Sequence, residues 1–154
     1  MTGAGVPTTS DASRLGDYLA EHSEHVQLLA HDAMSFVEAT LGGATRMVYV
    51  NFNATVLSYS PDGKSRHSIC SVVAYSKWVN LCFFVGPHLP DPDGLLQGSG
   101  STVRSVRIKD SADLDARVSG LLDAALAMWP WRYSADLPIT TRIVAVSDKR
   151  RPVR

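Results

Sequence analysis

The stretch from His67 to Gly86 alternates between apolar and mixed side chains on both sides of Ser76-Lys77. Alternation with a period of two is typical of β-strands, and a two-residue break between two such runs predicts a hairpin. When Tyr75 is paired with Trp78, one face of this hairpin is uniformly apolar and consists of Cys70, Val72, Ala74, Val79, Leu81, Phe83 and Val85. We therefore expect helices to pack against this face only.

Three further runs have the strand period. The first extends from Met47 to Tyr59, and Pro61-Asp62-Gly63 then provides a turn toward the hairpin. The register that keeps its apolar residues on one face pairs Ala54 with Val72, and it sets Asn51 beside Tyr75 and Asn53 beside Val73. The other two predicted strands are Thr102–Ile108 and Arg142–Ser147.

Apolar residues that recur every three or four positions predict three helices. The first is short and capped by Asp11 or Ser13, and the second runs from about Ser23 to Leu41. The third can start at Asp113 or Asp110.

The predicted fold is α+β, an antiparallel sheet of four to five strands with two main helices packed on one face. Residues 1–12 are small and polar and are expected to form a flexible lead, and residues 13–127 carry the main domain. Residues 128–154 form a C-terminal extension with one more strand candidate and a basic tail.

Length and composition fit a single globular domain, because 154 residues with 45% hydrophobic residues can bury a core without a disulfide or metal. Fifteen basic residues balance fifteen acidic ones, which argues against a nucleic-acid or anionic-membrane partner. No apolar run is long enough to span a membrane and no signal-peptide core is visible, so we expect a cytosolic protein. The predicted register places Cys70 and Cys82 on opposite faces, so both thiols are expected to be reduced.

The sheet face away from the helices has the composition of a binding surface. Amides arranged among aromatic rings can orient a small ligand by hydrogen bonds while the rings supply buried area. The candidate ligand-binding residues are Tyr49, Asn51, Asn53, Ser71, Tyr75, Trp78 and Asn80. A second copy of the chain, as in a homodimer, or the C-terminal segment is the alternative cover for this face.

Several spaced motifs resemble the YdhG-like family, known as domain of unknown function 1801. They are YLA in the first helix, WVNLCFFVG in the hairpin, the loop PDPDGLLQGSGS, and TVRSVRIKD with Arg104 in the following strand. The resemblance implies a frataxin-like fold. The chain departs from the family pattern at Gln97, Gly100-Ser101 and Trp78, where members often have Glu, Gly-Lys and His.

The long helix offers an alternative function that the resemblance suggests, because frataxin-like proteins handle iron with acidic surfaces. Glu21, His25 and Asp32 lie within about 40° of one another on a helical wheel, and carboxylate and imidazole groups can share a divalent metal. The same spacing is also typical of solvated ion pairs. Iron is thus the cofactor of the alternative hypothesis only.

The other patterns in the sequence give weaker indications of function. The glycines at 94, 98 and 100 precede a strand and lack the GK[ST] of a phosphate loop, so turns that require positive φ explain them. Trp129, Trp131 and Tyr133 are expected to cover a core edge or a subunit contact. No nucleophile–base pair stands out, so a non-enzymatic small-ligand-binding or homo-oligomeric assembly module is favoured over an enzyme.

Overall fold

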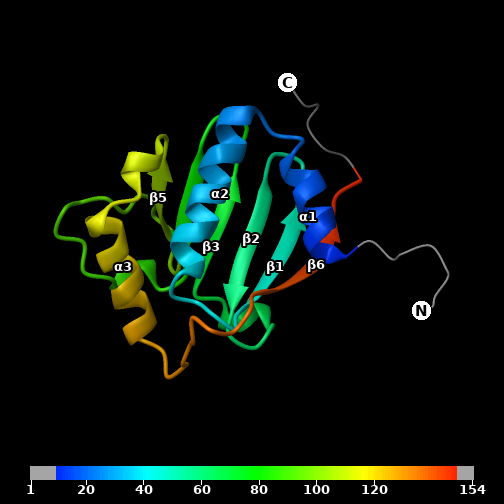
Figure 1. The fold of residues 1–154 in the computed structure, drawn as a ribbon. Coiled ribbons are helices and arrows are strands. Elements are labelled where there is room, and N and C mark those ends of the chain that lie inside the picture. The colour runs from blue at the N-terminus through cyan, green and yellow to red at the C-terminus, as the bar shows by residue number, and fades with distance from the viewer. Residues whose placement is uncertain (1–9, 149–154) are drawn as a thin grey trace.

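A computed structural model describes residues 10–148 as an α+β fold with one six-stranded sheet (Figure 1). The strands are β1 (Thr45–Val50), β2 (Thr55–Ser60), β3 (Cys70–Ala74), β4 (Val79–Phe83), β5 (Arg104–Ile108) and β6 (Thr140–Val146), in the spatial order β5-β4-β3-β2-β1-β6. The first five pair antiparallel, whereas β6 runs parallel to β1. The predicted α+β class is confirmed, but the predicted sheet of four to five antiparallel strands is wrong: the sheet is mixed and has six.

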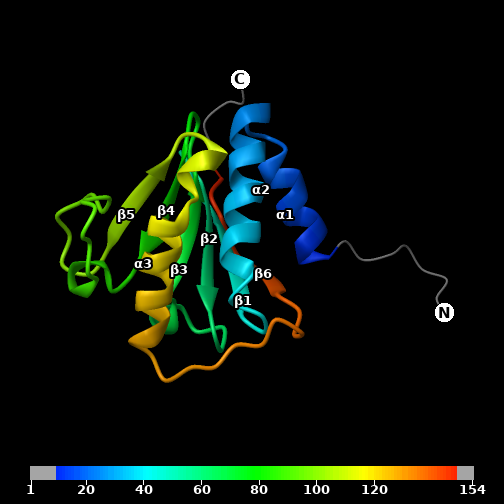
Figure 2. The same cartoon turned by 60° about the vertical axis from the view of Figure 1, so that its left-hand side comes forward.

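Three helices cover one face of the sheet, as Figures 1 and 2 show. They are α1 (Asp11–Leu19), α2 (Glu24–Glu38) and α3 (Ala116–Ala127), and short 3₁₀ helices lie at Ser65–His67, Gly86–His88 and Ser111–Asp113. The hydroxyls of Ser10 and Ser23 accept hydrogen bonds from the first-turn amides of α1 and α2, and Asp115 caps α3. The helix caps expected at Asp11 or Ser13 and at Asp110 or Asp113 are therefore wrong, although Asp110 caps the 3₁₀ turn before α3.

The central hairpin has the predicted form. Tyr75 N donates to Trp78 O at 2.9 Å across the Ser76-Lys77 turn, and Val72 pairs with Leu81. Val48, Leu57, Val72, Leu81 and Val106 form one buried row across five strands, beneath the helices. The apolar face of the hairpin is therefore part of the sheet surface that packs in the hydrophobic core.

The strand predicted from Met47 to Tyr59 is two strands. Asn51 N donates to Ala54 O at 2.8 Å and closes a turn between β1 and β2. The pairing of Val50 with Thr55 changes the parity, so even-numbered residues face the helices before the turn and odd-numbered ones after it. Because Phe52 and Ala54 are apolar, the run of even-numbered apolar residues continues through the turn, and the sequence pattern does not reveal the change of parity. The predicted register is wrong as a result: Leu57 pairs with Val72, and Val56 with Val73.

The C-terminal extension is part of the sheet, because β6 pairs with β1 along its length. At the outer edge of β6, Ile143 N donates to the Asp11 carboxylate at 2.9 Å, so α1 occupies part of the exposed strand edge. The helix that carries Asp11 begins within the stretch 1–12 that was expected to lead into the domain. Residues 1–9 and the basic tail, 149–154, lie outside the described residues.

A partly buried polar cluster joins α2 to three strands. The Glu38 carboxylate accepts from Arg46 Nη1 at 2.5 Å and from the Tyr59 hydroxyl at 2.6 Å, and Arg46 Nη2 donates to Thr141 Oγ1. Burial, together with the Glu38 charge, raises the pKa of the Tyr59 hydroxyl well above its usual value. Tyr59 therefore stays neutral and donates a hydrogen bond to Glu38.

His22 joins the turn between α1 and α2 to the sheet. Its Nε2 lies 2.9 Å from Thr55 Oγ1. Loss of hydration lowers the pKa of His22, against the opposing effects of a hydrogen bond with the Tyr75 backbone and of the Glu21 charge. This imidazole is therefore held in its neutral form in the folded protein.

Leu28 and Leu29 provide a test of the packing on α2. Leu29 is 1% exposed and lies in the core, whereas its neighbour Leu28 is 62% exposed. We expect Leu29→Ala to lower the free energy of unfolding by about 2–5 kcal/mol, because it leaves a cavity. Leu28→Ala should change it by less than about 0.5 kcal/mol. Urea unfolding of both variants measures the difference, and equal losses would contradict the orientation of α2.

The pKa of His22 predicts how stability depends on pH. The pKa is lower in the folded than in the unfolded chain, so the unfolded chain binds this proton more readily. The contribution of neutral His22 to the free energy of unfolding is complete at neutral pH and should be lost as the pH falls below about 6.5. His22→Gln should reduce the fall in unfolding free energy between neutral and mildly acidic pH, as measured by urea titrations. His88→Gln, at an exposed position, is the control and should retain the wild-type dependence.

Candidate functional site

We call the sheet surface that points away from the helices the open face. Strand pairing places two rows of side chains across it, and no helix of residues 10–148 lies over them (Figures 1 and 2). The rows are Tyr49, Val56, Val73, Asn80 and Arg107, and Met47, Ser58, Ser71, Cys82 and Ser105. Tyr75 and Trp78 continue this surface at the β3–β4 turn.

The most distinctive part of the open face is an aromatic–arginine cluster, which comprises Tyr75, Trp78, Asn80 and Arg107. The guanidinium carbon of Arg107 lies 4.1 Å from the centroid of the Trp78 ring, and the Tyr75 ring lies 5.8 Å from it at an interplanar angle of 42°. Asn80 pairs directly with Arg107 across β4 and β5. A cation held over an indole ring is attracted by the ring's electrons and kept in a defined place.

Two polar atoms of this cluster are buried without a hydrogen-bond partner among the described residues. They are the donor Trp78 Nε1 and the acceptor Asn80 Oδ1. Such atoms are uncommon in folded proteins, and each costs roughly 1–3 kcal/mol when it is left unbonded. The cluster therefore offers one donor and one acceptor that another molecule can satisfy.

The structure brings only some of the predicted binding residues together. Tyr49, Tyr75, Trp78 and Asn80 share the open face with Arg107. The Ser71 hydroxyl is buried and lies 2.7 Å from Ser58 Oγ, so it is already engaged. Asn51 and Asn53 lie exposed in the β1–β2 turn, away from the positions beside Tyr75 and Val73 that the register predicted.

Arg107 was missed as a site residue. Its strand was predicted, and Val106 and Ile108 show that the residue between them points away from the helices. The long connection from Gly86 to Ser101 concealed which strand β5 would join and in which register. Only the pairing of Asn80 with Arg107 places the guanidinium on Trp78.

The residues of the metal hypothesis are engaged elsewhere. Glu21 precedes α2, His25 Nε2 lies 3.1 Å from Lys109 O, and Asp32 accepts a hydrogen bond from Ser111. Across residues 10–148, no group of three or more His, Cys, Asp or Glu side chains is arranged to hold a metal ion. The iron alternative therefore has no cluster of ligands to support it.

A second polar group lies at the opposite end of β3. His67 Nδ1 is 2.7 Å from Asp62 Oδ2, and the Trp131 ring packs 5.5 Å from the imidazole. Loss of hydration raises the pKa of Asp62, but hydrogen bonds from His67, Lys64 N and Ser60 outweigh it and lower the pKa to about 2. The Ser60 hydroxyl faces Asp62 and Lys64 O, so it does not form a nucleophile–base pair with His67.

The other two aromatic residues of the connection between α3 and β6, Trp129 and Tyr133, pack against the core. This placement agrees with the prediction that they cover a core edge. Burial, together with the Cys70 and Asp62 charges, raises the pKa of Tyr133 to about 12.

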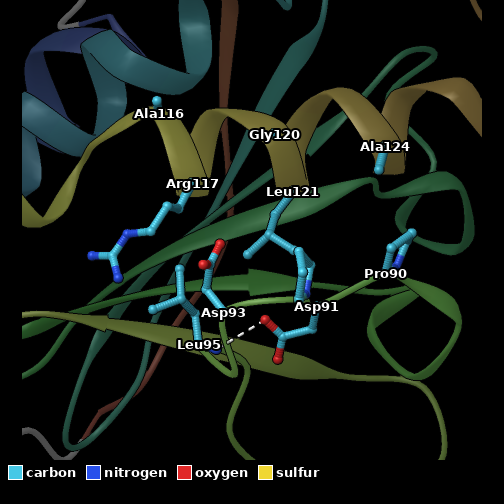
Figure 3. A pocket seen from close by; sticks show the side chains of 10 residues that line it. Pro90, Asp91, Asp93, Leu95, Ala116, Arg117, Gly120, Leu121 and Ala124 are labelled. Atoms are coloured by element: carbon cyan, nitrogen blue, oxygen red, sulfur yellow. Dashed lines mark hydrogen bonds between the residues drawn. The ribbon is translucent and has the colours of Figure 1, made fainter.

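A groove of about 470 Å³ lies between α3 and the loop that follows Gly86 (Figure 3). Both carboxylate oxygens of Asp91 accept backbone hydrogen bonds, from Leu95 N and Leu96 N at 2.9 Å each. Gly94 and Gly98 have φ of 64° and 114°, so the expected positive-φ turns are confirmed there, but the expectation is wrong at Gly100, and the loop leads into a strand. Apart from Asp91, Asp93 and Arg117, the groove is lined by apolar and small residues.

No protein-family model, curated protein or solved structure matches this chain. The resemblance to the YdhG-like family accordingly stays a prediction from the sequence. Among residues 10–148, no helix combines the length and the apolar character needed to cross a bilayer.

The two thiols are free, as the predicted register required, and lie on opposite faces because Cys82 pairs with Ser71, the neighbour of Cys70. Burial raises the pKa of Cys82 to about 11 and raises the pKa of Cys70 still further.

Since the thiolate is the reactive form, native Cys82 should react with iodoacetamide at mildly alkaline pH more than tenfold more slowly than in the unfolded chain. Mass spectrometry should find two alkylated cysteines after unfolding without reductant. Protection of both thiols in the unfolded chain would indicate a disulfide and contradict this register.

Proposed function

We propose that this protein is a non-enzymatic binding module that takes a small ring-containing ligand at the aromatic–arginine cluster of the open face. The observation that carries the proposal is the pair of unbonded buried atoms, Trp78 Nε1 and Asn80 Oδ1, beside two aromatic rings. Rings supply apolar area, and a donor with an acceptor supplies orientation, which is the usual composition of a small-molecule site.

Both atoms are buried, and we infer that Arg107 moves aside when a ligand reaches them. Arg107 is exposed, and apart from the Trp78 ring no acceptor or carboxylate among residues 10–148 engages its guanidinium. An exposed cation–π contact is worth about 0.5–1 kcal/mol, so displacing the guanidinium costs little. A ligand with an adjacent acceptor and donor, such as a carboxamide or a nucleobase edge, can then bond to both Trp78 Nε1 and Asn80 Oδ1.

Self-association through the open face is the other form of the proposal. Tyr and Trp are enriched in subunit interfaces, and a second copy could also satisfy Trp78 Nε1 and Asn80 Oδ1. The two forms differ in their concentration dependence, because only self-association responds to dilution of the protein alone.

The test uses benzamide and cytidine as neutral probes. Each carries a ring with neighbouring donor and acceptor groups. In ¹H–¹⁵N spectra, both should shift the indole N–H signal of Trp78 and leave the signals of Trp129 and Trp131 unchanged. Trp78→Phe and Asn80→Ala should each weaken binding up to about tenfold, as expected for one lost hydrogen bond. Trp131→Phe, at the other end of β3, is the matched control and should bind as the wild type does.

Two results would contradict ligand binding at this cluster. The first is the absence of any shift of the Trp78 signal with either probe in a monomeric protein. The second is a Trp78 signal that shifts on dilution while light scattering shows dimers dissociating, which would favour self-association.

A further inference from the structure

The distribution of charge on the open face indicates what its ligand carries. None of the six strands contains an aspartate or a glutamate. All fifteen acidic residues lie on helices or connections, so the acidic groups are separated from the sheet surface. The charged residues at the paired positions of the open face are Arg107 and Arg142.

Of these two guanidinium groups, Arg142 is already engaged. Its Nη2 donates to Gly63 O at 2.6 Å and lies 3.4 Å from Met47 Sδ. Arg107 contacts the Trp78 ring, and no acceptor or carboxylate among residues 10–148 engages it. Arg107 is therefore the cation of this surface that is free to bind an acceptor.

Neighbouring residues add positive charge at the same end of the sheet. Lys77 lies exposed in the β3–β4 turn, and exposed Lys109 follows β5 directly. The nearest acidic residues in sequence are committed to backbone amides: Asp110 accepts from Ala112 N, and Asp113 from Lys109 N and Asp110 N.

This positive surface stands out against the rest of the described chain. Four of the fifteen basic residues follow Asp148, so residues 10–148 contain eleven basic and fifteen acidic residues. Because residues 10–148 have an acidic excess, their net charge does not account for a positive cluster on the open face. It favours anions at this one place.

The chemistry of Arg107 suits it to this role. A guanidinium can donate two parallel N–H hydrogen bonds to an oxyanion. Its weak contact with the Trp78 ring keeps it beside the site until a ligand displaces it.

We propose that the ligand of the open face carries an oxyanion, a carboxylate or a phosphate, in addition to its ring, and that Arg107 binds this group. The inference rests on the proposed function, because it concerns the same cluster. Trp78 Nε1 and Asn80 Oδ1 bond to the ring substituent, and Arg107, displaced from the indole, binds the oxyanion.

The test compares matched pairs of probes that differ only in charge. They are benzamide with 4-carbamoylbenzoate, and cytidine with cytidine 5′-monophosphate. The charged member of at least one pair should bind tenfold more tightly or better, about 1.4 kcal/mol, in titrations followed by the Trp78 indole signal. The pair with the larger ratio distinguishes carboxylate from phosphate. The advantage should decrease with added salt.

Two arginine variants complete the test. Arg107→Gln should remove the advantage of the charged probes, so that the two members of each pair bind with affinities within about twofold of each other. Arg66→Gln removes the same charge at the opposite end of β3 and should retain the full advantage. Thermal unfolding of both variants checks that they fold.

The outcomes separate the two proposals. If neutral and charged probes bind equally, the ring site stands and the oxyanion is rejected. If no probe binds, the proposed function fails first. If an octathymidylate binds far more tightly than cytidine 5′-monophosphate with a steep salt dependence, the surface is a single-strand nucleic-acid site and the small-ligand inference is overturned.

Discussion

The structure depends on one constraint, the alternation of side chains across the strands. Each strand presents every second residue to the helices, and the sheet is stable only when those residues are apolar in all strands at once. The row from Val48 to Val106 shows the result, because its members lie in one hydrophobic core although they come from five strands. Slipping any strand by one residue would turn its apolar set away from the helices.

The same constraint determines what the open face contains. Residues on it were free to be polar or aromatic, and the centre of the face is indeed lined by small polar side chains such as Ser58 and Ser71. The cluster around Trp78 differs from this centre. It combines two rings, an arginine without an acidic partner and two unbonded polar atoms, none of which improves the packing of the core. Features that cost stability without improving packing are typical of binding sites.

The polar groups on the helix side behave in the opposite way. Glu38 bonds to Arg46 and Tyr59, although Arg46 Nε is left without a partner, and His22 is bonded to Thr55. The Asp62 carboxylate is likewise held by three donors. The contacts of Glu38 and His22 join separate elements and those of Asp62 hold one local turn, so the fold alone explains their roles. Arg46 Nε, Trp129 Nε1 and the Tyr133 hydroxyl are also buried without a partner, but the cluster of Trp78 and Asn80 combines two such atoms with an exposed arginine, which makes the open face the candidate site.

The sequence by itself determined the local structure that follows from periodicity. The hairpin turn at Ser76-Lys77, the apolar face of β3 and β4, and the strand that became β6 could all be predicted, because side-chain period depends on neighbours along the chain. Periodicity did not show the turn at Asn51–Ala54, since apolar residues continue in phase through it while the backbone changes parity. Only the tertiary structure decided that β6 runs parallel to β1 and that β5 brings Arg107 onto Trp78. Those pairings join segments separated by long connections, whose length leaves both partner and register open.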